Sequence, residues 1–139
     1  MRLIPNLKTK NKMKVKIDPI NTHSDARGIL FEPIEKDSIG CQNNIHIIIS
    51  KPGAVHGNHY HLNGTETIAV MGPALIRIKE NDDIYDIEVE PDEVTKLTIP
   101  PEVAHAIKNI SDRPRVFVAF NTVEHDPQHP DRVQDVIIR

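Results

Sequence analysis

The chain has 139 residues, of which 38% are hydrophobic, and its formal net charge at neutral pH is −3. This length favours one domain with a real hydrophobic core, and the slightly acidic balance excludes an electrostatic attraction to nucleic acid or to anionic membranes. The one cysteine, Cys41, has no partner for an internal disulfide, which fits a reducing, cytoplasmic compartment. No run reaches the roughly 18 apolar residues of a membrane helix, so we expect no membrane partner.

Residues 1–13 are expected to form a basic, flexible N-terminal extension. They carry four cations, Arg2, Lys8, Lys10 and Lys12, and lack the apolar segment of a secretory signal peptide. The folded domain is therefore expected to span residues 14–139.

From Lys14 onward the sequence predicts short strands. These segments are rich in β-branched residues, and most alternate apolar with polar positions, as in Leu75-Ile76-Arg77-Ile78-Lys79. Pro-Gly, Asn-Gly and similar turn pairs separate them, and no stretch shows helical periodicity. The pattern indicates a single all-β domain built as a closed antiparallel sandwich or barrel. The expected strands cover residues 15–20, 28–34, 43–50, 66–71, 74–80, 84–90, 93–100, 104–110 and 115–123.

The segment "NNIHIIIS", residues 43–50, contains three consecutive isoleucines. Such a strand is too apolar on both faces for an isolated monomer, and exposed sheet edges are commonly covered by a partner. We therefore expect a homodimer.

Three histidines and a glutamate lie within "HGNHYHLNGTE", residues 56–66. His59 and His61 are two positions apart, so in a strand their side chains leave the same face while Tyr60 points to the other. Asn63-Gly64 is typical of a tight hairpin turn, which would bring Glu66 on the returning strand beside the two imidazoles.

Together with "PPEVAHAIKN", residues 100–109, this region resembles the cupin superfamily. The first cupin motif is matched by Gly53, His59, His61, Glu66 and Gly72, with the last gap one residue short, and the second motif is matched by Pro100, His105 and Asn109. Glu102 stands where that second motif has a glycine. The resemblance implies a cupin double-stranded β-helix, or jelly-roll barrel, that holds a metal through His59, His61, Glu66 and His105.

Three neutral imidazoles and one carboxylate suit one divalent metal ion, with zinc expected first and iron, manganese, nickel or cobalt as alternatives. The competing interpretation is that the three histidines are polar rim residues that serve hydrogen bonds alone. His56 is either a group at the mouth of the site or a simple loop histidine.

The other histidines are not expected to form a metal or catalytic site. His23 and His46 have no evident partner in the sequence, so they are expected to be surface or packed residues. His125 and His129 have the spacing of a helical metal pair, but Pro127 and Pro130 make a helix there improbable.

The segment "DARGILFE", residues 25–32, resembles the sugar-nucleotide epimerases related to dTDP-4-dehydrorhamnose 3,5-epimerase. In that family the arginine and glutamate hold the nucleotide, often across a dimer interface. The resemblance implies that Arg27 and Glu32 bind substrate, and an arginine can pair with a diphosphate through two parallel hydrogen bonds. Judged from the residues alone, Asp25 and Arg27 form a turn-stabilising pair at least as readily.

Several blocks, including "SKPGAVHGNHYH" and "IPPEVAHAIKN", are similar to the C-terminal cupin domain of capsular-polysaccharide assembly reductases. That domain binds zinc and is implicated in C3 epimerisation of a nucleotide-linked keto-deoxy sugar. The resemblance implies proton abstraction beside a ketone, with His59, His56 or Tyr60 as the catalytic group. His59 is either a metal ligand or the general base, and the presence of the other three ligands favours the metal role.

Two other classes stay open. A metal-dependent dioxygenase or decarboxylase uses the same four ligands. A non-catalytic sugar-binding cupin has the same fold, since fold alone does not define function.

Overall fold

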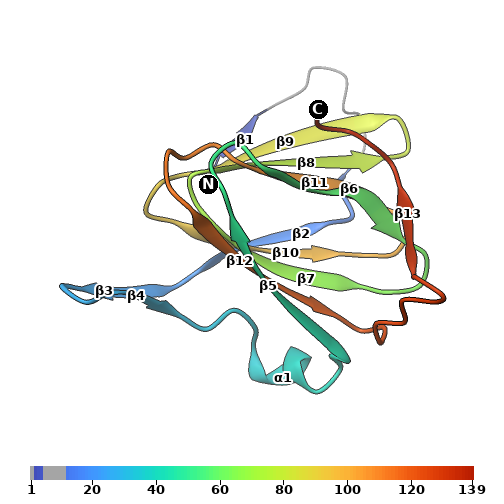
Figure 1. Ribbon diagram of the computed structural model, residues 1–139, viewed down its shortest axis with the longest axis horizontal. Helices are drawn as coiled ribbons and strands as arrows, with labels where there is room; N and C mark the ends of the chain where they lie inside the picture. Colours follow the sequence, from blue (N-terminus) through green and yellow to red (C-terminus); the bar gives the residue numbers. More distant parts are fainter. Residues whose placement is uncertain (1, 5–11) are drawn as a thin grey trace.

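The computed structural model describes residues 2–4 and 12–139, and within them it contains antiparallel strands and one single-turn helix (Figure 1). The all-β prediction is confirmed. The elements are β1 (Arg2–Ile4), β2 (Lys16–Ile20), β3 (Thr22–Asp25), β4 (Gly28–Phe31), α1 (Lys36–Ile39), β5 (Asn44–Ser50), β6 (Val55–His61), β7 (Glu66–Met71), β8 (Ala74–Glu80), β9 (Asp83–Val89), β10 (Val94–Ile99), β11 (Ala104–Asn109), β12 (Arg115–Asn121) and β13 (Arg132–Gln134). No helix in this part of the chain has the length and apolar character needed to cross a membrane.

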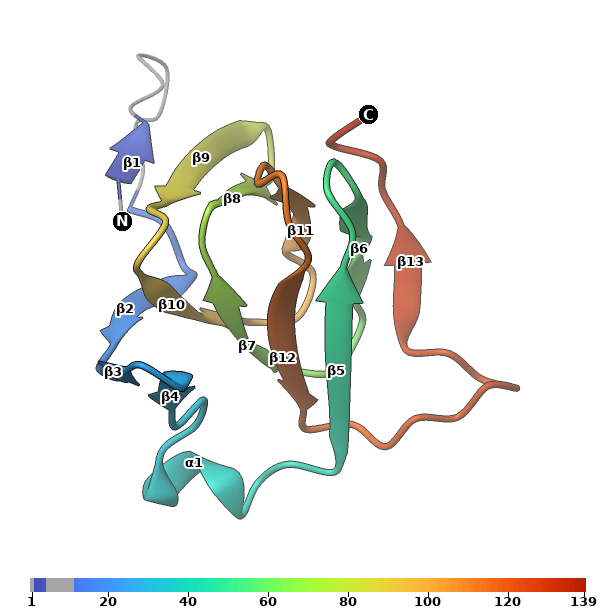
Figure 2. The same cartoon turned by 60° about the vertical axis from the view of Figure 1, so that its left-hand side comes forward.

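Two antiparallel sheets face each other and form the walls of a barrel (Figures 1 and 2). The first has the strand order β1-β9-β8-β11-β6-β13, and the second has the order β2-β10-β7-β12-β5. From β5 to β12, strands that follow one another in sequence lie in opposite sheets, except that β8 and β9 form a hairpin, and this is the jelly-roll arrangement expected of a cupin.

Alternating residues of the two sheets fill the space between them. In β8 the apolar positions Ala74, Ile76 and Ile78 are buried, while the alternate positions Arg77 and Lys79 are partly exposed. Ile87, Leu97, Ile99 and Phe117 are among the fully buried residues that other strands contribute. This apolar core holds both sheets in register, so residues near the strand ends keep fixed positions.

The hairpin predicted at Asn63-Gly64 is wrong. β6 and β7 do not pair with each other, because the loop between them crosses from one sheet to the other. Glu66 therefore faces the histidines of β6 from the opposite sheet. Neither Asn63 nor Gly64 is among the described residues with positive φ, so the turn does not have the backbone that the dipeptide suggested.

The predicted N-terminal extension is only partly described, since residues 5–11 lie outside the described part of the chain. At its two ends the extension makes contacts with the domain. Arg2–Ile4 pair with β9 as strand β1, and Met13 packs against the hydrophobic core.

Two features of the surface are apolar. The hairpin of β3 and β4 projects away from the two sheets (Figure 1). Its residue Leu30 is 63% exposed to solvent. β5 is an edge strand, and along one face it exposes Ile45, Ile47 and Ile49, at 59%, 70% and 70%.

Gly57 lets β6 approach β11 at the irregularity in their pairing beside His105. Its φ is +89°, and a Cβ there would lie 2.7 Å from the carbonyl oxygen of His105. We expect Gly57→Ala to lower the free energy of unfolding by about 1–3 kcal/mol, because the strands must separate to admit the methyl group. Thermal or urea denaturation measures this loss. Gly40→Ala is the matched control, since Gly40 has a negative φ and open space around it, and an equal loss in both variants would contradict the prediction.

Candidate metal centre and its cavity

Four side chains converge inside the barrel: His59, His61, Glu66 and His105. One potential ligand atom from each residue lies within 4.8 Å of those of the other three. This is the set that the cupin resemblance implied, and it is the group of this kind found within the described residues.

Three strands supply these side chains. His59 and His61 both lie on the inner face of β6, two positions apart, and their ring centroids are 5.0 Å from each other. His105 on the neighbouring strand β11 pairs with His59 in register, with ring centroids 4.9 Å apart. Glu66 is the first residue of β7 and reaches the histidines from the facing sheet.

The carboxylate of Glu66 lies between two imidazoles. Its Oε2 is 2.7 Å from Nε2 of His105 and 3.0 Å from Nε2 of His61. Nδ1 of His105 is 3.2 Å from the carbonyl oxygen of Val103 and donates to it. This backbone contact fixes the ring so that Nε2 faces the cluster, as the outer hydrogen bond of a metal-ligating histidine does.

Burial and charge set the protonation of the cluster. Burial, assisted by the nearby His105, lowers the pKa of His59 to about 4, so His59 is neutral at neutral pH. Burial alone would raise the pKa of Glu66, but the charge and hydrogen bond of His105 outweigh it and hold that pKa well below its usual range. Burial lowers the pKa of His105, yet the Glu66 carboxylate more than compensates and raises it. The neutral imidazole of His59 is thus ready to donate a lone pair to a metal, and the shifts at Glu66 and His105 both favour an ion pair between these two residues.

The donor set fits a divalent cation. A partly buried carboxylate, with 12% of its side chain exposed, is held against two imidazoles by hydrogen bonds that a cation would replace. Nitrogen and carboxylate oxygen ligands in this number suit zinc and the neighbouring divalent metals.

Two loops hold the ligand strands in place. Glu102, which stands at the motif's glycine position, adopts a φ of +66°, and its N–H donates to the carbonyl of His61 at 2.7 Å. In the loop after β6, the backbone N–H groups of Asn63 and Gly64 both donate to the carboxylate of Asp131. These contacts tie β11 and the C-terminal segment to the end of β6.

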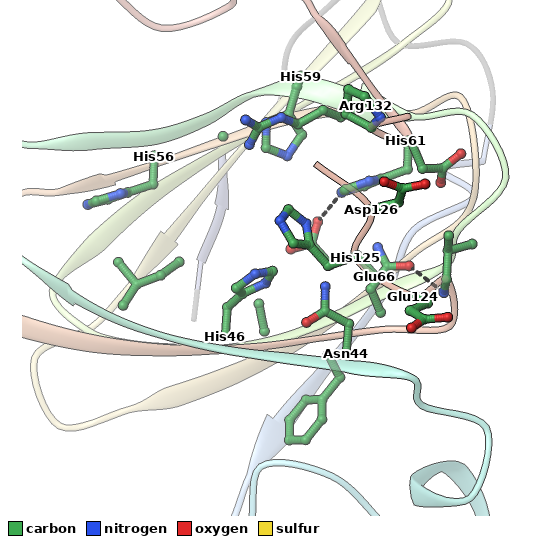
Figure 3. A pocket seen from close by; sticks show the side chains of 18 of the residues that line it. Asn44, His46, His56, His59, His61, Glu66, Glu124, His125, Asp126 and Arg132 are labelled. Atoms are coloured by element: carbon green, nitrogen blue, oxygen red, sulfur yellow. Dashed lines mark hydrogen bonds and ion pairs between the residues drawn. The ribbon is translucent and has the colours of Figure 1, made fainter. Parts of the chain in front are cut away.

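A cavity of about 350 Å³ opens beside the cluster (Figure 3). His56, His59, His61 and Glu66 line it, and Nε2 of His56 is 2.9 Å from the hydroxyl of Ser50. Tyr60 is not among the lining residues, in keeping with its expected orientation toward the other face of β6. Of the three residues considered for catalysis, His56 and His59 therefore share the cavity and Tyr60 does not.

The two residues expected to bind substrate lie elsewhere in the chain. Arg27 sits at the tip of the projecting hairpin with 91% of its side chain exposed and pairs with Asp25 at 2.6 Å. Glu32 follows that hairpin and lines a separate depression with His23 and Leu30. Within one chain, neither residue lines the cavity of the cluster.

Sequence reasoning missed several lining residues, among them His46, His125 and Arg132. The sequence did hold a signal for His46. It lies two positions before Ile48 on the same strand, so the two side chains share a face, and Ile48 packs against the core. His125 and Arg132 belong to the segment after β12 and are brought to the cavity by tertiary contacts alone. Arg132 enters through the pairing of β13 with β6, opposite His61.

Comparisons with known proteins agree with this architecture. Residues 23–133 match the model of the polysaccharide biosynthesis C-terminal domain family. The spore coat polysaccharide biosynthesis protein SpsL of Bacillus subtilis is 26% identical over 129 residues, which cover 84% of each chain.

Solved structures show the same fold. The capsular polysaccharide assembling protein CapF of Staphylococcus aureus superposes with a TM-score of 0.63 at 28% identity, covering 86% of this chain and 33% of CapF, so the chain spans about a third of that protein. The 3,4-ketoisomerase QdtA of Thermoanaerobacterium thermosaccharolyticum, solved as a double mutant in complex with TDP, superposes with a TM-score of 0.68 at 22% identity, covering 90% of each chain. The match over most of its length shows that the chain belongs to the polysaccharide biosynthesis C-terminal domain family, on a cupin fold.

Proposed function

We propose that this protein is a metal-binding cupin that isomerises or epimerises a nucleotide-linked keto-deoxy sugar in the biosynthesis of a surface polysaccharide. The observation that carries the proposal is the convergence of three imidazoles and a carboxylate beside a cavity large enough for a sugar ring. The family assignment supports the pathway, and the fold shared with QdtA, a ketoisomerase solved with TDP-4-keto-6-deoxyglucose, supports the substrate class.

The residues of the cavity suit proton transfer beside a ketone. In this proposal His59, His61, Glu66 and His105 hold one divalent cation, with zinc foremost. A cation bound there supplies Lewis-acid polarisation of a substrate oxygen. His59 is then committed as a ligand, and His56 is the lining histidine left on β6 to accept a proton. Its Nε2 is engaged by Ser50, and its Nδ1 makes no hydrogen bond with the described residues.

Binding the diphosphate of the nucleotide requires a positively charged side chain. Arg132 lines the mouth of the cavity and has no ion pair within the described part of the chain, so its guanidinium is available to a phosphate. We retain Arg27 and Glu32 as substrate-binding residues that the projecting hairpin of a second copy delivers to the cavity. That role depends on a homodimer.

The homodimer proposal rests on strand β5. One edge of β5 pairs with β12 and the other edge pairs with no described strand, while Ile45, Ile47 and Ile49 are exposed side by side. Two identical edge strands pair antiparallel about a two-fold axis and form a closed assembly. A second copy would therefore cover both the free hydrogen-bonding edge and the isoleucines.

Removing a ligand should remove the metal. We expect His61→Ala and His105→Ala to lose metal affinity by well over the ten- to hundredfold typical of an outer hydrogen-bonding partner, because a direct ligand is lost. Elemental analysis of the purified variants measures the metal content per chain. His129→Ala is the control, since His129 is exposed and lies outside the cluster. Full occupancy in both ligand variants would contradict the metal assignment and return His59 to the role of free base.

The wild-type protein should exchange a carbon-bound hydrogen of its substrate with solvent. TDP- and UDP-linked 4-keto-6-deoxyglucose are incubated with the metal-loaded protein in D₂O, and NMR detects deuterium at C3 or C5. Deuterium appears there because abstraction of the proton beside the ketone leaves an enolate, and in D₂O that carbon takes up a deuteron supplied by the solvent. Tight binding of both nucleotides without any deuterium incorporation would instead support a non-catalytic sugar-binding cupin.

The exposed isoleucines should mediate self-association. Light scattering at micromolar concentration is expected to give the mass of a dimer for the wild-type protein, and Ile47→Glu should shift it toward the monomer because a charge replaces a buried apolar contact. Ile39→Glu is the matched control, because Ile39 is 56% exposed but lies on α1. A monomeric wild-type mass would rule out the dimer.

A further inference from the structure

A second pair of histidines lies in the cavity, apart from the metal cluster. His46 on β5 and His125 in the segment after β12 have their rings edge to face, with centroids 5.9 Å apart. Both side chains are exposed at the mouth, and both line the same cavity as the cluster. Figure 3 shows them near the β5 side of the cavity, while His59 and His61 extend from β6 on the other side.

The ring nitrogens of this pair are uncommitted. Two other histidines of the cavity have hydrogen-bond partners: His56 contacts Ser50, and His61 contacts Glu66. Neither His46 nor His125 makes a hydrogen bond or ion pair with any described residue, although each lies against the other. Two imidazoles that line a cavity and make no such bond with the described residues are able to contact a bound substrate directly.

The two walls belong to different sheets. His46 comes from the sheet that contains β7 and β12, whereas His56 and His59 come from β6 in the facing sheet. A sugar ring seated between the walls therefore presents one face to the β6 histidines and the other face to His46 and His125. Reactions that remove a proton from one face and return one to the same carbon from the other face invert that carbon, and they require acid–base groups on both sides.

We propose that His46 and His125 form the acid on the second face, so that the reaction inverts a carbon beside the ketone. This rests on the proposed function and names its stereochemical outcome. In the first step the C–H bond breaks, its proton passes to the base on the β6 wall, and the electron pair forms the enolate. In the second step an imidazolium N–H of the pair breaks, a new C–H bond forms on the opposite face, and the ketone returns. The base then loses its proton to solvent and the pair regains one, so no oxidant or reductant is needed.

The test separates hydrogen exchange from inversion. Metal-loaded wild-type protein, His46→Gln, His125→Gln and the double variant are each incubated with TDP- or UDP-4-keto-6-deoxyglucose in D₂O. NMR follows deuterium incorporation into the original sugar and the appearance of the inverted sugar as separate signals. His129→Gln is the matched control, since His129 lies in the same segment but does not line the cavity. Thermal denaturation and TDP binding verify that each variant is folded and retains its nucleotide site.

The wild-type protein and His129→Gln are expected to show both exchange and inversion. The His46 and His125 variants should keep exchange into the original sugar, while inversion falls by about 100-fold or more, the usual contribution of a positioned acid. Inversion at the wild-type rate in the double variant would overturn the assignment, as would loss of exchange and inversion together in a folded variant. Wild-type exchange without inversion would refute this inference and leave the proposed function standing, whereas wild-type protein with neither activity would refute both.

Discussion

The carboxylate of Glu66, placed between the imidazoles of His61 and His105, is the contact on which the rest of the site depends. It joins the two sheets, because Glu66 belongs to one wall of the barrel and both histidines belong to the other. A carboxylate in this partly buried place is costly unless it is paired, and the two imidazoles meet that cost. The same pairing that satisfies the charge also gathers the donor atoms of a cluster that could hold a metal ion.

Different elements hold the clustered residues in place and form the mouth of the cavity. The ligand strands are held by the apolar core, by the close approach at Gly57 and by the backbone contact from Glu102 to His61. The mouth of the cavity is instead built by the segment after β12, which Asp131 anchors to the loop beyond β6. The cluster that could hold a metal is thus fixed by one set of contacts and the mouth of the cavity by another, so a change in the segment that builds the mouth need not disturb the cluster.

The cavity also distinguishes two kinds of histidine by their partners. His61 and His105 have nitrogens committed to Glu66, and His105 is further fixed by a backbone carbonyl, so these rings suit fixed ligation. His46 and His125 make no such contact with the described residues and are exposed. In our proposals one residue type therefore has two roles in one cavity, and the surroundings of each ring separate those roles.

The sequence by itself determined the all-β class, the cupin motifs and the identity of the four clustered residues, because strand alternation and motif spacing are local properties of the chain. It was wrong about how Glu66 arrives, since a turn dipeptide does not reveal whether the next strand stays in the sheet or crosses to the facing one. It also missed His46, His125 and Arg132, and the substrate-binding role that it assigned to Arg27 and Glu32 stays a prediction, since within one chain neither residue lines the cavity. Those positions depend on which distant segments pack together, and this is decided by burial of the shared core in the tertiary structure.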